Sequence, residues 1–191
     1  MTAEKIKKAA LETFAQKSYE GTTLAEIAEK VEIKKPSIYA HFSSKEDVFF
    51  TVLKEEINNF CLYIDKIETE IESNRVEKIL FELLTRGIEY FYQNPIKKGF
   101  WKNVLFCPNR ILKEKINSNM IAISEKIYHS AFYIMKQGIK NKEIEEDDIE
   151  YMIYSFECLL HGNFALLLYD KFTFEKFNKS WDVYWNGIKK R

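Results

Sequence analysis

Apolar residues at helical spacing, rarely interrupted by glycine or proline, are the feature that most constrains this chain. Apolar residues recur every three or four positions along nearly all of its 191 residues, and the sequence holds only six glycines and three prolines. That period is typical of amphipathic α-helices, whereas half-buried strands alternate at every second residue. The sequence contains no internal repeat and no low-complexity tract. We therefore predict an all-α fold of about nine helices.

Residues 22–45 predict two short helices joined by a tight turn. Thr23 and Glu26 form a T-x-x-E capping box, in which each side chain satisfies a backbone amide at a helix start. Pro36 suits the first turn of the next helix, where its missing N–H has no intrahelical partner to lose. Such a pair, here residues 23–42, is typical of a helix-turn-helix, whose second helix enters the DNA major groove.

A long helix follows this motif and joins two predicted domains. Ser44 with Asp47 repeats the capping pattern, and the apolar period then continues to about residue 72 without a flexible linker. We place a three-helix DNA-binding domain at residues 1–47 and a helical ligand-binding and dimerisation domain at 48–191. Apolar stripes predict the helices of the second domain at about 75–93, 100–106, 109–137, 148–169 and 173–188.

The N-terminal sequence resembles the DNA-binding domain of the tetracycline-repressor (TetR) family over about 55 residues. The matching positions are Ile6, Ala9-Ala10, Phe14, Tyr19, Thr22-Thr23, Ile27-Ala28, Val31, Ile33, Ile38-Tyr39, His41-Phe42 and Ser44-Lys45-Glu46. Two positions depart from the family, which usually has Gly where this chain has Ser18 and Glu32. Because Glu tolerates a positive φ poorly, we expect the turn to be either strained or shaped differently.

The resemblance implies a homodimeric transcriptional regulator, a ligand-released repressor that reads a near-palindromic DNA operator. Lysines at these offsets in a helix-turn-helix favour phosphate and base contacts over an ordinary surface role. In the family, the tyrosine that matches Tyr39 commonly reaches a phosphate. We expect DNA contacts from Thr23, Lys34, Lys35, Pro36, Ser37, Tyr39, His41 and Lys45.

Charge and cysteine content set limits on partners and compartment. Lys and Arg number 29, as do Asp and Glu, and residues 1–47 hold eight lysines and eight acidic residues. This neutrality counts mildly against DNA binding, although DNA responds to the local lysine cluster. Three widely spaced cysteines argue against a disulfide framework and for a reducing cytoplasm. The longest apolar run has six residues, which excludes a membrane span.

The second domain combines many aromatic residues with no recognisable catalytic motif. The few, scattered glycines exclude a P-loop, a dinucleotide fingerprint and a nucleophile elbow, so we expect neither an enzyme nor a cofactor. No histidine or cysteine spacing indicates a metal site. Each aromatic residue alone is more simply core, but the set favours a pocket for a small apolar or aromatic effector. The candidate lining is Phe91, Phe100, Trp101, Phe132, Tyr154, Cys158 and His161.

The last two helices are the predicted homodimer interface. In the TetR family they pair across a two-fold axis, and the aromatic stripe of the last helix here needs a cover. The candidate interface is Met152, Phe156, Leu159, Asn163, Phe177, Trp181, Tyr184 and Trp185. The alternative for the whole chain is an all-α small-molecule carrier or small enzyme that does not bind DNA, which the neutral first domain favours.

Overall fold

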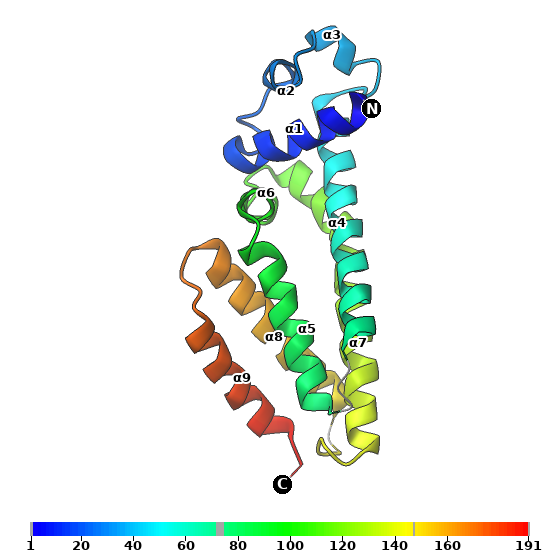
Figure 1. Cartoon of the computed structure of the whole chain (residues 1–191), viewed down its shortest axis with the longest axis vertical. Helices are drawn as coiled ribbons and strands as arrows, with labels where there is room; N and C mark the ends of the chain where they lie inside the picture. Colours follow the sequence, from blue (N-terminus) through cyan, green and yellow to red (C-terminus); the bar gives the residue numbers. More distant parts are fainter. Residues whose placement is uncertain (1, 72–74, 147, 191) are drawn as a thin grey trace. The chain divides into compact units, whose positions relative to one another are not determined.

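The computed structural model describes residues 2–71, 75–146 and 148–190, and these form nine α-helices with no β-strand (Figure 1). The predicted all-α class is confirmed. The helices are α1 (Thr2–Lys17), α2 (Leu24–Lys30), α3 (Lys35–Ile38), α4 (Lys45–Glu70), α5 (Val76–Tyr92), α6 (Pro95–Leu105), α7 (Arg110–Lys140), α8 (Ile149–Leu168) and α9 (Phe174–Ile188).

Most predicted helix ends lie within a few residues of the observed ones, because capping residues mark them. The α2 capping box is complete, and the Ser44 hydroxyl accepts from the Asp47 amide at 3.0 Å to begin α4. Asp148 caps α8, while the other candidate cap, Asp147, lies outside the described residues. The start of α6 was predicted too late: Asn94 caps it and the following proline occupies its first turn.

The chain divides into two compact units. The first contains the residues up to Asn59 together with Asn94–Ile121, and the second contains Phe60–Gln93 together with the residues from Ala122 onward. Helices α4 and α7 contribute to both units. This division reflects packing and does not test the predicted functional boundary after residue 47, which stays a prediction.

The first unit is built around aromatic side chains from α1, α4 and α6. The ring of Phe49 lies 5.1 Å from that of Phe14 and 6.0 Å from that of Phe100. On α6, the Asn103 amide donates to the carbonyls of residues 14 and 15 at 2.8 and 3.0 Å. Gly99 allows this close approach, since a Cβ there would lie 3.0 Å from the carbonyl oxygen of Ala15. The last turn of α1 is thereby fixed to α6.

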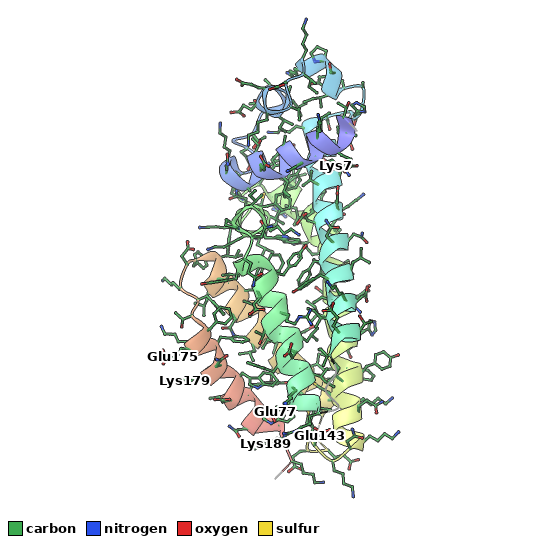
Figure 2. The ribbon with its side chains drawn as sticks, in the orientation of Figure 1. Lys7, Glu77, Glu143, Glu175, Lys179 and Lys189 are labelled. Carbon is green, nitrogen blue, oxygen red and sulfur yellow. The ribbon has the colours of Figure 1, made fainter. Side chains whose placement is uncertain are left out.

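The second unit is tied together at one end by the segment between α7 and α8. The Glu143 carboxylate accepts from the Val76 amide at 3.0 Å and so caps α5 (Figure 2). Ile144 forms an isolated antiparallel bridge with Lys189 after α9. Gly138 permits this packing, because a Cβ there would lie 2.7 Å from the Ile144 side chain. One short segment therefore holds the start of α5 and the end of α9.

The two positions that depart from the family's glycines both adopt left-handed backbone. Ser18 has φ 62° and Glu32 has φ 57°. An L-residue in this region loses roughly 1–2 kcal/mol relative to ordinary helical backbone, and glycine avoids that steric penalty. The turn at Glu32 keeps the backbone conformation that glycine favours. Of the two expected alternatives, a strained turn and a turn of different shape, the structure therefore shows the strained turn.

Replacing Glu32 by Gly should therefore stabilise the protein. Relief of strain, reduced by the larger entropy of glycine in the unfolded chain, should raise the free energy of unfolding by about 0.5–1 kcal/mol. Urea denaturation measures the change. The matched control is Glu29→Gly in α2, which should lower stability by up to about 1 kcal/mol because its backbone is helical. A lower stability for Glu32→Gly would show that the turn is not strained.

Candidate nucleic-acid interface

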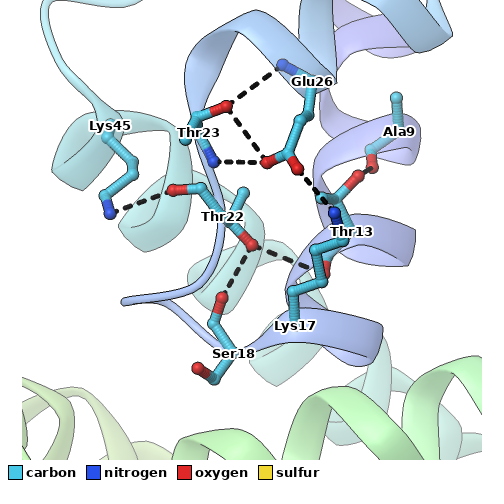
Figure 3. Close-up of polar contacts among 8 residues, drawn as sticks. All are labelled: Ala9, Thr13, Lys17, Ser18, Thr22, Thr23, Glu26 and Lys45. Carbon is cyan, nitrogen blue, oxygen red and sulfur yellow. Dashed lines mark hydrogen bonds and ion pairs between the residues drawn. The ribbon is translucent and has the colours of Figure 1, made fainter.

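The start of α2 is fixed by a network around Thr23 (Figure 3). The Thr23 amide and hydroxyl donate to the Glu26 carboxylate at 2.9 and 3.0 Å, and the Glu26 amide donates back to that hydroxyl at 3.3 Å. The Lys17 ammonium also binds Glu26. The Lys17 contact first, and then the two Thr23 donors, lower the pKa of Glu26 to about 2. The carboxylate thus stays ionised and holds α2 onto the end of α1.

Helix α3 is short and is anchored by its two ends. Ile38 is fully buried, and Phe42 just beyond the helix is also buried. Lys34 is the extended N-cap residue, and Pro36 occupies the first turn, where it needs no donor. These anchors hold the remaining residues of the segment at the surface.

Most of the predicted DNA-contacting residues lie together on this exposed segment. Exposed side chains in and beside α3 are Lys34, Lys35, Pro36, Ser37, Tyr39 and His41. Neither Lys34 nor Lys35 forms an ion pair with any described residue, so both ammonium groups face solvent. Thr23 is exposed too, but its hydroxyl is occupied by the capping box. DNA contact by all of these residues stays a prediction.

Lys45 differs from the other predicted DNA-contacting lysines. It is half-buried, and its ammonium donates to the carbonyls of Tyr19 at 2.8 Å and Thr22 at 3.1 Å. The same ammonium lies 4.2 Å from the centroid of the Tyr19 ring. The sequence motif could not reveal these partners, because they lie more than twenty positions earlier in the chain.

The predicted ligand-binding residues are not brought together. Phe100 and Trp101 belong to the first unit, where both are buried. Phe91 is core of the second unit, packed between the rings of Phe60 and Phe164 at 5.0 and 4.7 Å. The others do not share its surroundings: Phe132 is half-buried, and Tyr154, Cys158 and His161 are exposed on α8. This set therefore does not line one pocket.

A different set of residues encloses a small apolar cavity in the second unit. Its volume is about 10 Å³, which is about the space of a single water molecule. Gly87 is notable among the lining residues, because a Cβ added there would meet nothing within 4 Å. The sequence signal that could have indicated this cavity is a glycine in the interior of a predicted helix. The lining is Phe60, Ile64, Leu83, Leu84, Gly87, Ile127, Phe156 and Leu160.

The predicted dimer residues are mainly core of their own chain. Burial inside the second unit is nearly complete for Met152, Phe156, Asn163, Phe177, Trp181 and Trp185. Leu159 and Tyr184 are half-buried, and the Tyr184 hydroxyl donates to the Met152 carbonyl at 3.1 Å. Burial also raises the pKa of Tyr184. The aromatic stripe of α9 therefore packs largely within its own subunit, and its part in an intermolecular interface stays a prediction.

The face of α8 that points away from the core of the second unit carries a row of exposed residues. Tyr151 is 72% exposed and Tyr154 is 66% exposed. At helical spacing beyond them, Cys158, Leu166 and Tyr169 are also exposed. Gly162 lies in the same row with nothing within 4 Å of an added Cβ. We call residues 151, 154, 158, 162, 166 and 169 the α8 outer stripe.

The described residues offer little for other chemistry. They contain no cluster of three or more His, Cys, Asp or Glu side chains that could hold a metal ion. Across residues 2–71, 75–146 and 148–190, every helix is too short or too polar to cross a membrane.

Comparison with known proteins agrees with the motif. Residues 6–52 match the model for bacterial regulatory proteins of the tetR family. The chain is 28% identical to the HTH-type transcriptional regulator QacR of Staphylococcus aureus over 140 residues, which cover 73% of this chain and 72% of QacR. It is 33% identical to the biofilm operon negative regulator IcaR of the same species over 84 residues, 42% of this chain and 45% of IcaR.

The whole fold also has a close counterpart among solved structures. The transcriptional regulator FadR from Bacillus subtilis, solved with stearoyl-CoA, superimposes with a TM-score of 0.76 at 19% identity, covering 97% of this chain and 98% of that one. The motif, its geometry and these relatives agree: residues 6–52 match the tetR-family DNA-binding domain, and most of the chain is similar to TetR-family transcriptional regulators.

Proposed function

We propose that this chain is a cytoplasmic, homodimeric repressor that binds a near-palindromic DNA operator and is released by a small apolar or aromatic effector. The observation that carries the proposal is the exposed segment around α3. There Tyr39 and two lysines that form no ion pair with any described residue project from a backbone held by buried Ile38. A dimer presents two such segments, which matches the symmetry of a palindromic site.

The alternative is an all-α carrier or small enzyme that does not bind DNA. The neutral first domain favours it, but the apolar cavity beside Gly87 has space for only about one water molecule. A mobility-shift assay with duplex from the gene's own upstream region separates the two. Specific retardation supports the repressor, and its absence at micromolar protein supports the alternative.

The first prediction concerns phosphate contacts by Lys34 and Lys35. Each Lys→Ala substitution should weaken DNA binding and reduce the slope of log affinity against log salt by about one, because one fewer counterion is released. Fluorescence anisotropy across a salt series measures both quantities. Lys54→Ala, an exposed lysine on α4, is the matched control and should change neither. If both α3 variants keep the wild-type slope, the lysine pair does not contact DNA.

The homodimer is proposed to form through the α8 outer stripe. Three exposed tyrosines and an exposed leucine lie in a row along α8 and at its C-cap, and exposed apolar side chains grouped in this way are typical of interaction sites. Gly162 within the row would let a partner helix approach closely. This interface replaces the buried aromatic stripe of α9 that the sequence suggested.

The second prediction is that Tyr154→Asp separates the subunits. Sedimentation of the wild type at micromolar concentration should give twice the 22.8 kDa chain mass, and the variant should sediment as a monomer because a carboxylate is costly to bury. Tyr133→Asp on α7 is the control, since Tyr133 is equally exposed at 66% and should leave the dimer intact. A Tyr154→Asp dimer of wild-type stability would place the interface elsewhere.

The effector is proposed to enter the second unit beside Gly87. Every residue around the cavity is apolar, and α4 carries Phe60 and Ile64 of this lining on the same helix that begins at Lys45. Helix α4 has no Gly or Pro along its length, so movement at the cavity can be transmitted along a continuous helix. An effector that binds better to an opened second unit would shift the population away from the DNA-binding form.

The third prediction tests this site by filling it. Gly87→Ala should raise the free energy of unfolding by about 1 kcal/mol, because helix propensity improves and the new methyl meets no clash. The same methyl should take up most of this space and weaken release by an effector identified in a DNA-release screen, while DNA affinity without effector stays at the wild-type value. An unchanged effector response in Gly87→Ala would exclude this site.

A further inference from the structure

Lys45 connects the start of α4 to the loop that precedes α2. Its ammonium donates to two loop carbonyls, those of Tyr19 and Thr22, and it lies over the Tyr19 ring at 4.2 Å (Figure 3 shows the Thr22 bond). Two of its three donor hydrogens are thereby used inside the protein. The aromatic face adds an attraction to the same charge.

The loop that Lys45 binds has little conformational freedom. The Thr22 hydroxyl donates to the Ser18 carbonyl at 2.7 Å, and Ser18 has a left-handed backbone. Gly21 is required where it stands, since a Cβ there would lie 2.2 Å from the Lys17 carbonyl oxygen. Thr22 then leads directly to Thr23, the N-cap of α2. Whatever fixes this loop therefore fixes the start of the helix-turn-helix.

The start of α4 does not depend on Lys45 for its own position. The Ser44 hydroxyl caps the helix through the Asp47 amide, and the neighbouring Glu46 is paired with Lys115 of α7. Loss of the Lys45 ammonium would leave these contacts in place. Its effect should fall on the loop, where the carbonyls of Tyr19 and Thr22 would lose their charged donor.

We propose that Lys45 is a positioning residue, which orients α2 and hence α3 through the 19–22 loop, and that it is not one of the lysines that bind phosphate. This inference rests on the proposed DNA binding and assigns Lys45 a different role from Lys34 and Lys35. Those two lysines are exposed and without an ion pair among the described residues, whereas the Lys45 ammonium is held against its own chain.

Salt dependence distinguishes the two roles. The assay uses a duplex that the wild type retards in a mobility shift. Lys45→Ala should bind this duplex about tenfold more weakly than the wild type, which is the size expected for losing a charge-assisted contact. Its log affinity against log salt should keep the wild-type slope, since no phosphate contact is lost. Lys35→Ala is the matched comparison, with a slope smaller by about one. A slope reduced by about one in Lys45→Ala, or an unchanged affinity, overturns the proposal.

A measurement without DNA tests the loop itself. Amide hydrogen exchange of residues 19–24 should be faster in Lys45→Ala than in the wild type and unchanged in Lys35→Ala. Unchanged exchange in Lys45→Ala also overturns the proposal. Hydrogen exchange is measured without DNA, so it tests the role of Lys45 even if the wild type binds no duplex. Failure of the wild type to bind any duplex would instead contradict the proposed function.

A double-mutant cycle adds a third readout. Tyr19→Leu removes the ring beneath the ammonium, so its effect on DNA affinity should overlap with that of Lys45→Ala if both act through the loop. The double variant should then bind no more than about twofold more weakly than the weaker single variant. Fully additive losses would mean that Lys45 acts independently of the loop, which contradicts the proposal.

Discussion

The packing of aromatic rings around Phe49 is the interaction on which the first unit depends. Its ring contacts Phe14 of α1, Tyr19 of the following loop and Phe100 of α6, at centroid distances from 5.1 to 6.0 Å. Full burial of one such side chain is worth roughly 1.5–3 kcal/mol, which is a large share of the stability of a small domain. Because these three elements meet on one residue of α4, the loop that begins the helix-turn-helix is set by the core beneath it.

Local features of this fold could be read from the sequence because their causes are local. Capping at Thr23 and Ser44 acts within three residues, and the periodic apolar positions report which side of each helix is buried. The exposed segment around α3 also followed from the motif. At Glu32, the departure from the family's glycine left a strained turn as one of two alternatives, and the positive φ of Glu32 bears that alternative out.

What the sequence could not supply was the partner of each buried face. The stripe of Phe177, Trp181 and Trp185 was rightly read as buried, but periodicity cannot distinguish the protein's own core from a second subunit. Phe100 does not join a pocket in the second unit for a related reason. Helix α6 packs on α1, with 89 positions between Asn103 and Phe14, so aromatic density in the second half of the chain does not make one pocket. Both cases concern long-range contacts, which spacing within one helix does not encode.

The nearly closed cavity beside Gly87 places an energetic condition on any effector. A core with space for about one water molecule must open before a larger apolar molecule can enter, so only the opened fraction of the population binds. The apparent affinity is reduced by that fraction, and the free energy of opening must come from the contacts that the effector makes. The glycine lowers this cost in one respect, because it leaves α5 without a side chain at the proposed point of entry. The same requirement makes release selective, since a molecule that cannot replace the lost core contacts leaves the closed form in place.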